Sequence, residues 1–219
     1  MRVGMVGATG PAGTALAARL AAGGVEVVMG SRSADRAAEA CEALARKWPE
    51  ANLPLTPATN SGAADEDVVI VATSWDAAVT TAAALADQLA GKVVVSMANA
   101  LARIDGQFQA ITPPGGSVAA GMAEAVPDAL VAAAFQHLPA ASVADLNRLL
   151  TGDVLICSDH PRAHDVSAEL VRAMPALRPL DAGRLASAGP VEALTAVLVG
   201  LNVRYRARVS VSLLGIAGS

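Results

Sequence analysis

Three glycines near the N-terminus have the spacing of a loop that binds a diphosphate. Gly7, Gly10 and Gly13 lie in the run Gly7-Ala8-Thr9-Gly10-Pro11-Ala12-Gly13, between a strand-like apolar segment and a predicted helix. In this setting the first glycine permits a tight turn, the second lets a pyrophosphate approach the backbone, and the third lets helix and strand pack closely. Free amides and the helix dipole then favour an anion. The run predicts a dinucleotide site; the alternative is an ordinary tight turn.

The segment after the second predicted strand carries residues that could recognise a phosphate. Ser31 and Arg32 follow the apolar run near residues 25–30, and Arg36 lies four residues after Arg32. An NAD site usually has an acidic residue at this strand end, which accepts hydrogen bonds from the ribose hydroxyls and repels a 2′-phosphate. A guanidinium instead binds phosphate through two parallel hydrogen bonds, and a serine hydroxyl adds a donor. These residues predict NADP(H) as the cofactor; the alternative is two solvated arginines at a helix start.

The chain offers few residues for strong acid or base catalysis. His137 follows a predicted strand, where the ligand crevice of an open parallel sheet is expected, so it either contacts substrate or is a hydrogen-bonded structural histidine. The only lysines are Lys47 and Lys92, and Tyr205 is followed four residues later by Val209. The lysine of hydroxyacid dehydrogenases and the Tyr-x-x-x-Lys pair of short-chain dehydrogenases are therefore both missing. We expect no indispensable catalytic acid or base, with His137 as a weak candidate.

Two further clusters have weaker functional interpretations. His160 and His164 have the i, i+4 spacing of paired metal ligands, but no third soft ligand lies nearby in the sequence, so no metal site is expected. Arg204, Arg206 and Arg208 form a basic cluster near the C-terminus. They are either a solvated helix end or a clamp for an anionic substrate tail or a partner subunit.

Alternating strands and helices must position these residues. Short apolar runs alternate with alanine-rich stretches of helix length, which is the pattern of βαβ units on a parallel sheet. Strands are predicted near residues 2–6, 25–30, 67–72, 92–97, 129–135 and 153–157, with a weaker, proline-containing edge strand at 53–59. Helices are predicted near residues 11–22, 34–47, 75–89, 160–173 and 190–206. Residues 98–117 are predicted to form a long loop.

This order of elements predicts an α/β fold: a doubly wound, Rossmann-type, mainly parallel sheet with a small helical C-terminal section. We expect a dinucleotide-binding domain over residues 1–180 and a helical section over residues 181–219 that serves the substrate pocket and dimerisation. The C-terminal helix is apolar on nearly all sides from Val191 onward. Because the chain's own sheet cannot cover every side of it, we expect a homodimer.

Composition argues against several other classes of protein. Of the 219 residues, 53% are hydrophobic and 16% are charged, which is typical of a soluble globular chain. The net charge of −4 and the 2% aromatic content argue against nucleic-acid binding. Cys41 and Cys157 lie far apart and form no CxxC, which favours a reducing, cytoplasmic compartment. The chain starts on a strand-like segment and holds no uninterrupted apolar run of about 18 residues, so neither a signal segment nor a membrane span is expected.

The sequence resembles the NADPH-dependent coenzyme F420 reductases, also called F420:NADP oxidoreductases, over nearly the whole chain. The segments that carry the resemblance are Gly7–Gly13, Gly30–Arg32, Val71–Trp75, Pro139–Ala141, Ala144–Leu146, Leu177–Gly183, Val191–Leu194 and Asn202–Ala207. The chain departs from the usual family pattern at Gln136, where relatives often place a histidine, and at Met97–Leu101, where the family's usual segment contains a proline.

The resemblance implies hydride exchange between NADP(H) and an 8-hydroxy-5-deazaflavin, coenzyme F420, as co-substrate. It assigns the NADP phosphates to Thr9, Ser31, Arg32 and Arg36, beside the glycine run Gly7, Gly10, Pro11, Ala12 and Gly13. It assigns the nicotinamide side to Ala72, Thr73, Ser74 and Trp75, and the deazaflavin side to Ser96, Met97, Ala98, Asn99, Gln136, His137 and Leu138. Two alternatives stay open: an NADPH-dependent reductase of another acceptor, such as a flavin or a metal, and a non-enzymatic NmrA-like NADP sensor.

Overall fold

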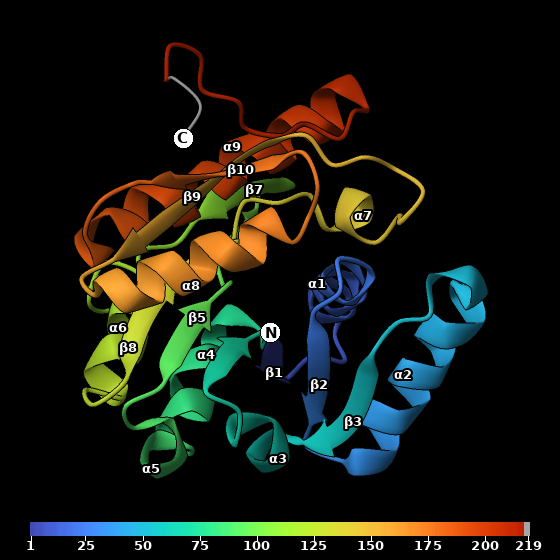
Figure 1. The fold of residues 1–219 in the computed structure, drawn as a ribbon. Coiled ribbons are helices and arrows are strands. Elements are labelled where there is room, and N and C mark those ends of the chain that lie inside the picture. Colours follow the sequence, from blue (N-terminus) through green and yellow to red (C-terminus); the bar gives the residue numbers. More distant parts are fainter. Residues whose placement is uncertain (217–219) are drawn as a thin grey trace.

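The computed structural model describes residues 1–216, which form one twisted sheet with helices on both faces (Figure 1). The eight strands lie in the order β10-β9-β8-β5-β4-β1-β2-β3. All neighbouring strands are parallel except β8 and β9, which are antiparallel. The strands are β1 (Arg2–Val6), β2 (Glu26–Ser31), β3 (Leu55–Thr59), β4 (Val68–Val71), β5 (Val93–Ser96), β8 (Leu130–Ala133), β9 (Gly152–Ser158) and β10 (Leu177–Asp181).

The helices alternate with these strands along the chain. They are α1 (Pro11–Ala22), α2 (Ala34–Lys47), α3 (Asn60–Ala64), α4 (Trp75–Ala83), α5 (Ala86–Leu89), α6 (Val118–Ala125), α7 (Ala140–Val143), α8 (Pro161–Arg172) and α9 (Ala188–Tyr205). Two short 3₁₀ turns, η1 (Pro49–Ala51) and η2 (Leu185–Ser187), complete the set among the described residues. The predicted α/β, Rossmann-type, mainly parallel fold is confirmed.

The core lies on both faces of the sheet, as a doubly wound fold requires. Along β4, Ile70 packs into the cluster that includes α1 and α8, whereas Val69 and Val71 pack into the cluster that includes α3, α4 and α6. All three side chains are fully buried. The continuous apolar run in this strand therefore reflects cover on both sides.

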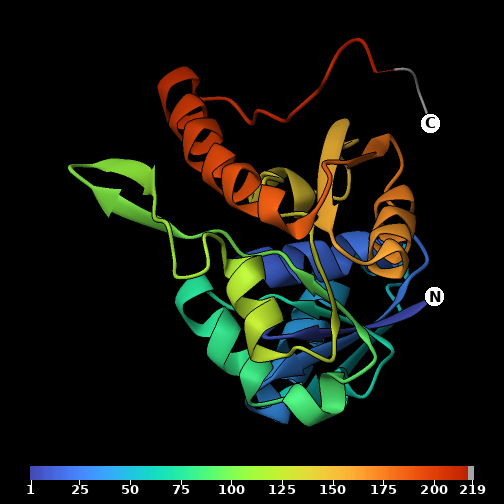
Figure 2. The same ribbon diagram turned by 90° about the vertical axis from the view of Figure 1, so that its left-hand side faces the viewer.

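The prediction of a loop over residues 98–117 is wrong for residues 101–110, which form an antiparallel hairpin. Strands β6 (Leu101–Ile104) and β7 (Gln107–Ala110) are joined by Asp105 and Gly106, whose φ angles are 49° and 80°. Positive φ at both central residues is the geometry that an Asp-Gly hairpin turn favours. The turn signal was therefore present, but both strands are largely exposed and lack a buried alternating face. The hairpin projects away from the body of the molecule (Figure 2).

Other elements also differ from the prediction. The single helix expected over residues 75–89 is divided into α4 and α5, because Leu85 leaves the helical conformation and Leu89 is then fully buried in the core. Helices α3, α6 and α7 and strand β10 were not predicted. Local propensity is a weak guide where tertiary packing decides.

Both edges of the sheet carry proline within a strand. The expected edge position of residues 53–59 is confirmed, because β3 is the last strand on one side and contains Pro57. Strand β10 is the last on the other side and contains Pro179. A proline lacks the N–H that a central strand would donate on both sides, so edge positions tolerate it.

Helix α9 packs one face against the body through a buried carboxylate. Glu192 is 4% exposed, and its carboxylate accepts the backbone N–H groups of Val118 and Ala119, at 2.9 and 3.2 Å, in the first turn of α6. A carboxylate placed there satisfies two amides that have no acceptor inside their own helix and interacts favourably with the helix dipole. Burial raises the pKa of Glu192, and the two backbone hydrogen bonds oppose that shift.

Other side chains of α9 are apolar and open to solvent. Val197 is 58% exposed and Val203 is 72% exposed. By length and composition, the helical segment Leu185–Tyr205 could cross a membrane. Its most apolar stretch of 18 residues has a mean hydropathy of 1.4, and 22% of that stretch is buried. This corrects the expectation that the chain holds no such segment, because one glutamate lowers the mean hydropathy of an apolar window only slightly. Core helices of soluble proteins meet the same criterion.

Candidate cofactor and active site

The register of the sheet places four loops at one edge. Val6, Val71, Ser96 and Ala133 are successive partners across β1, β4, β5 and β8. These strands are parallel, so the segments that follow them leave the sheet on the same side. Because ligands of open α/β sheets bind outside the carboxyl ends of the strands, this edge is the candidate site.

The three glycines of the first loop occupy three different environments. Gly7 has φ +73°, and a Cβ there would lie 2.3 Å from Cγ2 of Thr73. A Cβ on Gly13 would lie 2.7 Å from the carbonyl oxygen of Ala8, so the glycine is needed for α1 to pack against the turn. A Cβ on Gly10 would meet nothing within 4 Å. Gly7 and Gly13 are thus explained by packing, whereas Gly10 borders open space that a ligand could fill.

The N-terminus of α1 is free to bind an anion. Gly10 is the N-cap residue and supplies no side-chain cap, and Pro11 takes the first helical position. Pro11 and Ala12 are exposed, and the first-turn N–H groups of a helix have no acceptor within that helix. This arrangement is the usual geometry of a diphosphate site.

The predicted phosphate-recognition residues gather where β2 leads into α2. Ser31 is 3% exposed, and its hydroxyl oxygen accepts the backbone N–H of Ser33 at 3.4 Å. Ser33 is the N-cap of α2 and accepts the N–H of Arg36 at 3.5 Å. Arg32 and Arg36 are exposed, and neither forms a salt bridge within residues 1–216. Two unpaired guanidinium groups thus flank a helix N-terminus.

The residues assigned to the nicotinamide side connect β4 to α4. Ala72 continues the strand pairing, its N–H donating to the carbonyl of Val6 at 2.8 Å. The buried hydroxyl of Thr73 has no hydrogen-bond partner among the described residues. Ser74 is the N-cap of α4 and makes no side-chain cap, and Trp75 is half-buried. An unpartnered hydroxyl next to Gly7 gives this edge a polar group that a ligand can use.

The residues assigned to the deazaflavin side meet around the backbone of Gln136. The carbonyl oxygen of Gln136 accepts Nδ2 of Asn99 at 2.6 Å and Oγ1 of Thr195 at 3.2 Å. The Gln136 side chain is itself buried, and both of its amide atoms lack partners within the described part of the chain. The hydroxyl of Ser96 is also buried and unpartnered there. Buried polar groups are normally satisfied, so these mark a place where a polar ligand edge can bind.

Apart from His137, the other residues assigned to the deazaflavin side are apolar. Ala98 is 7% exposed, and Met97 and Leu138 are half-buried. Leu138 borders a small pocket with Arg148 and Arg208. The sequence did not single out Thr195, because a threonine on an apolar helix carries no signal until the helix is docked beside the segment that follows β8.

His137 forms a structural hydrogen bond. It is 3% exposed, and its Nε2 atom accepts the backbone N–H of Leu155 in β9 at 3.0 Å. Burial lowers the pKa of His137 to about 4, so the ring is neutral near pH 7. Its Nδ1 atom has no partner among residues 1–216. Of the two interpretations of His137, this geometry favours the structural histidine over a general acid.

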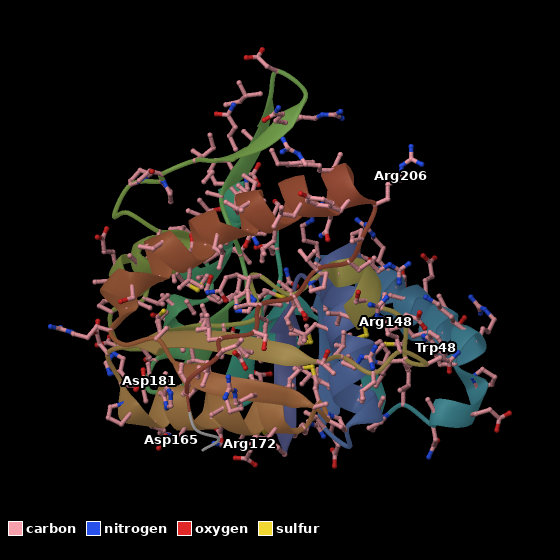
Figure 3. The ribbon with its side chains drawn as sticks, turned by 90° about the horizontal axis from the view of Figure 1, so that it is seen from above. Trp48, Arg148, Asp165, Arg172, Asp181 and Arg206 are labelled. Carbon is pink, nitrogen blue, oxygen red and sulfur yellow. The ribbon has the colours of Figure 1, made fainter. Side chains whose placement is uncertain are left out.

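Of the two weaker clusters, the basic one approaches this edge, because Arg208 lines the small pocket beside Leu138. Within residues 1–216, no group of three or more potential metal-ligating side chains comes together, and His164 contacts Asp165 at 3.3 Å. Arg206 ends α9 in the left-handed conformation, with φ 48°, and lies at the outer end of that helix (Figure 3). Arg208 lies 3.9 Å from the carboxylate of Asp145.

The sheet order, the glycine turn and the polar strand ends define a Rossmann-type dinucleotide-binding protein. The chain matches the family described as "NADP oxidoreductase coenzyme F420-dependent" over residues 2–100. It is 33% identical to the F420-dependent NADP reductases of Methanocaldococcus jannaschii, over 215 residues, and Methanothermobacter marburgensis, over 216 residues. Each alignment covers 95% of this chain and 95% of the relative. The protein belongs to the coenzyme F420-dependent NADP oxidoreductase family.

A solved structure supports the fold. The crystal structure of a putative F420-dependent NADP-reductase from Arthrobacter sp. FB24 superposes with a TM-score of 0.81 at 23% identity, covering 96% of this chain and 98% of that one. The similarity therefore includes the C-terminal helix as well as the sheet.

Proposed function

We propose that this protein transfers a hydride between NADP(H) and the deazaflavin coenzyme F420. The observation that carries the proposal is the full-length similarity to F420-dependent NADP reductases, at 33% identity over 95% of both chains. The edge where four loops converge supplies the place for the two ring systems to meet. An NmrA-like sensor is disfavoured by the same full-length similarity.

The NADP(H) half of the site is formed by the loops after β1 and β2. The amides of Thr9, Gly10 and Ala12 would hold the pyrophosphate at the uncapped N-terminus of α1. Arg32 and Arg36 would bind the 2′-phosphate, with the hydroxyl of Ser31 beside them. A carboxylate at this strand end, as an NAD site usually has, would repel that phosphate.

The acceptor half is formed by the loops after β5 and β8. The unpartnered amide of Gln136 offers both a donor and an acceptor to the polar edge of a ring system. Asn99, after β5, and Thr195, in α9, both donate to the backbone carbonyl of Gln136. The backbone that carries the Gln136 side-chain amide is therefore held in place. The half-buried Met97 and Leu138 supply apolar contacts on the same side.

Catalysis in this site rests on positioning. When bound, a reduced nicotinamide would supply the hydride and a deazaflavin would accept it, which is chemistry of the cofactors themselves. The chain's contribution would be to hold the two ring systems together in this site so that their reacting carbons meet. No acid or base is required of His137, whose buried ring is neutral.

The exposed face of α9 supports a homodimer. A groove of about 740 Å³ runs between α9 and the hairpin β6–β7, and Phe108, Val197, Leu201 and Val203 are among its lining residues. Monomeric proteins rarely expose apolar surface of this kind, and a second copy of the chain would cover it. We also infer a cytoplasmic protein that acts on small molecules, without nucleic acid or membrane. Free thiols at Cys41 and Cys157 support a reducing compartment.

Mixing the purified protein with NADPH and oxidised coenzyme F420 tests the function. We expect the visible absorbance of the oxidised deazaflavin to bleach in proportion to enzyme concentration, and faster with NADPH than with NADH. If both cofactors bind without bleaching, the acceptor is another flavin or a metal ion. If NADPH does not bind, the assignment of the glycine turn is wrong.

A further inference from the structure

A side chain from α3 reaches across the sheet edge to the glycine turn. Asn60 is the first residue of α3, and its Oδ1 atom accepts the backbone N–H of Gly7 at 3.0 Å. The two residues are 53 positions apart in the sequence. The preceding residue, Thr59, is the N-cap of α3, and its hydroxyl oxygen accepts the backbone N–H of Gly62 at 3.1 Å.

Glycines in β1 and β2 make this contact possible. A Cβ on Gly4 would lie 1.7 Å from the carbonyl oxygen of Ala63, and a Cβ on Gly30 would lie 2.8 Å from the Cβ of Ala63. Helix α3 therefore sits directly on the two strands, and Ala63 is fully buried. A Cβ on Gly30 would also come within 3.2 Å of Oδ1 of Asn60. The amide oxygen of Asn60 thus lies close to the ends of both strands.

The contact restricts which amides of the turn can bind a ligand. The N–H of Gly7 donates to Asn60, and the N–H of Ala8 donates to the carbonyl of Gly30 at 2.9 Å. Within residues 1–216, the N–H groups of Thr9 and Gly10 make no hydrogen bond to another protein group. The first two amides of the turn therefore fix its shape, and the next two remain for an anion.

We propose that Asn60 is a positioning residue of the cofactor site, which anchors Gly7 so that the amides of Thr9 and Gly10 face the pyrophosphate. This role rests on the proposed NADP(H) function. Asn60 acts through the backbone of Gly7, and its effect is confined to the pyrophosphate. Recognition of the 2′-phosphate at Arg32 proceeds without it.

Binding titrations with two ligands separate this role from general stability. NADPH carries the pyrophosphate, whereas adenosine 2′-monophosphate carries the 2′-phosphate alone. We expect Asn60→Ala to weaken NADPH binding about tenfold, which corresponds to about 1.4 kcal/mol, and to leave adenosine 2′-monophosphate binding unchanged. Ser61→Ala is the matched control, because that hydroxyl bonds the Gln88 side chain at 3.0 Å and lies on the same helix. It should leave both affinities unchanged.

Hydrogen exchange of the wild-type protein gives a second test that needs no variant. We expect the Gly7 amide to be protected before NADPH is added and to change little afterwards, while the Thr9 and Gly10 amides gain protection. A Gly7 amide that becomes protected only with NADPH overturns the proposal. So does an Asn60→Ala variant that binds NADPH normally, or one that loses both ligands equally. Failure of the wild-type protein to bind either ligand would instead overturn the proposed function.

Discussion

His137 accepts the backbone N–H of Leu155 through Nε2 at 3.0 Å, and this bond ties the loop after β8 to the middle of β9. The bond requires a neutral ring, since a protonated imidazole has no acceptor atom. A residue placed at the edge of the candidate site therefore has a structural role that depends on pH.

The first prediction concerns this pH dependence. Burial lowers the pKa of His137 from 6.5 to about 4, so the folded protein resists protonation that the unfolded chain accepts. Stability from this group is fully present above about pH 6.5 and is lost as the pH falls towards 4, by about 3 kcal/mol in all. His137→Gln keeps an acceptor and does not titrate, so its stability should fall less over this range. Urea unfolding of both proteins between pH 4 and 7 measures the difference, and parallel curves would contradict the prediction. Turnover of the variant at pH 7 should be lowered only modestly.

The second prediction concerns cofactor choice. Arg32→Ala removes a guanidinium that would contact only the 2′-phosphate. A hydrogen bond to a charged group contributes about 1.5 to 3 kcal/mol, so NADPH binding should weaken roughly ten- to a hundredfold while NADH binding barely changes. Ser31→Asp should go further towards NADH, because a carboxylate repels the phosphate and accepts a ribose hydroxyl. Titration of both cofactors decides between the interpretations: equal losses for NADH and NADPH mean that these residues support the fold.

The third prediction concerns a buried arginine that fixes the loop after α7. Arg19 in α1 is 9% exposed and donates to the backbone carbonyls of Ser142, Val143, Asp145 and Arg148. Burial lowers the pKa of Arg19, and Asp145 opposes that shift. Arg19→Met leaves these carbonyls without their donor and should destabilise the protein by about 3 kcal/mol.

A matched control for Arg19 lies on the surface of α2. Arg46 is 70% exposed and pairs with Glu42 one helical turn away, at 3.3 Å. Exposed pairs of this kind contribute little, so Arg46→Met should change stability by less than about 0.5 kcal/mol. Chemical denaturation compares the two variants. Similar effects for both would show that the carbonyl contacts of Arg19 contribute little.

The fourth prediction concerns assembly. Val197 is 58% exposed in the groove beside Phe108, so a charge there would be buried in a dimer and solvated in a monomer. Light scattering at micromolar concentration should give the mass of two chains for the wild type and of one chain for Val197→Glu. Glu50→Lys, on the distant turn η1, should leave the dimer intact. A monomeric wild type would contradict the prediction.

The sequence by itself determined the parts of this protein whose signals are local. Strands β1, β2, β4 and β5 and the glycine turn between β1 and α1 could be predicted, because apolar runs and glycine spacing report on a few adjacent residues. The Ser31–Arg32 strand end could be recognised for the same reason. The hairpin β6–β7 had a local signal in Asp105-Gly106, but its exposed strands gave no apolar alternation to support it.

Only the tertiary structure decided the contacts between distant segments. Asn60 reaches Gly7 because glycines in two strands let α3 lie directly on the sheet, and Thr195 reaches Gln136 because α9 docks beside the segment that follows β8. His137 could equally have faced a substrate or a strand until β9 was placed beside β8. Such contacts depend on how elements pack in three dimensions, and a sequence pattern that reports on one helix or strand does not contain that information.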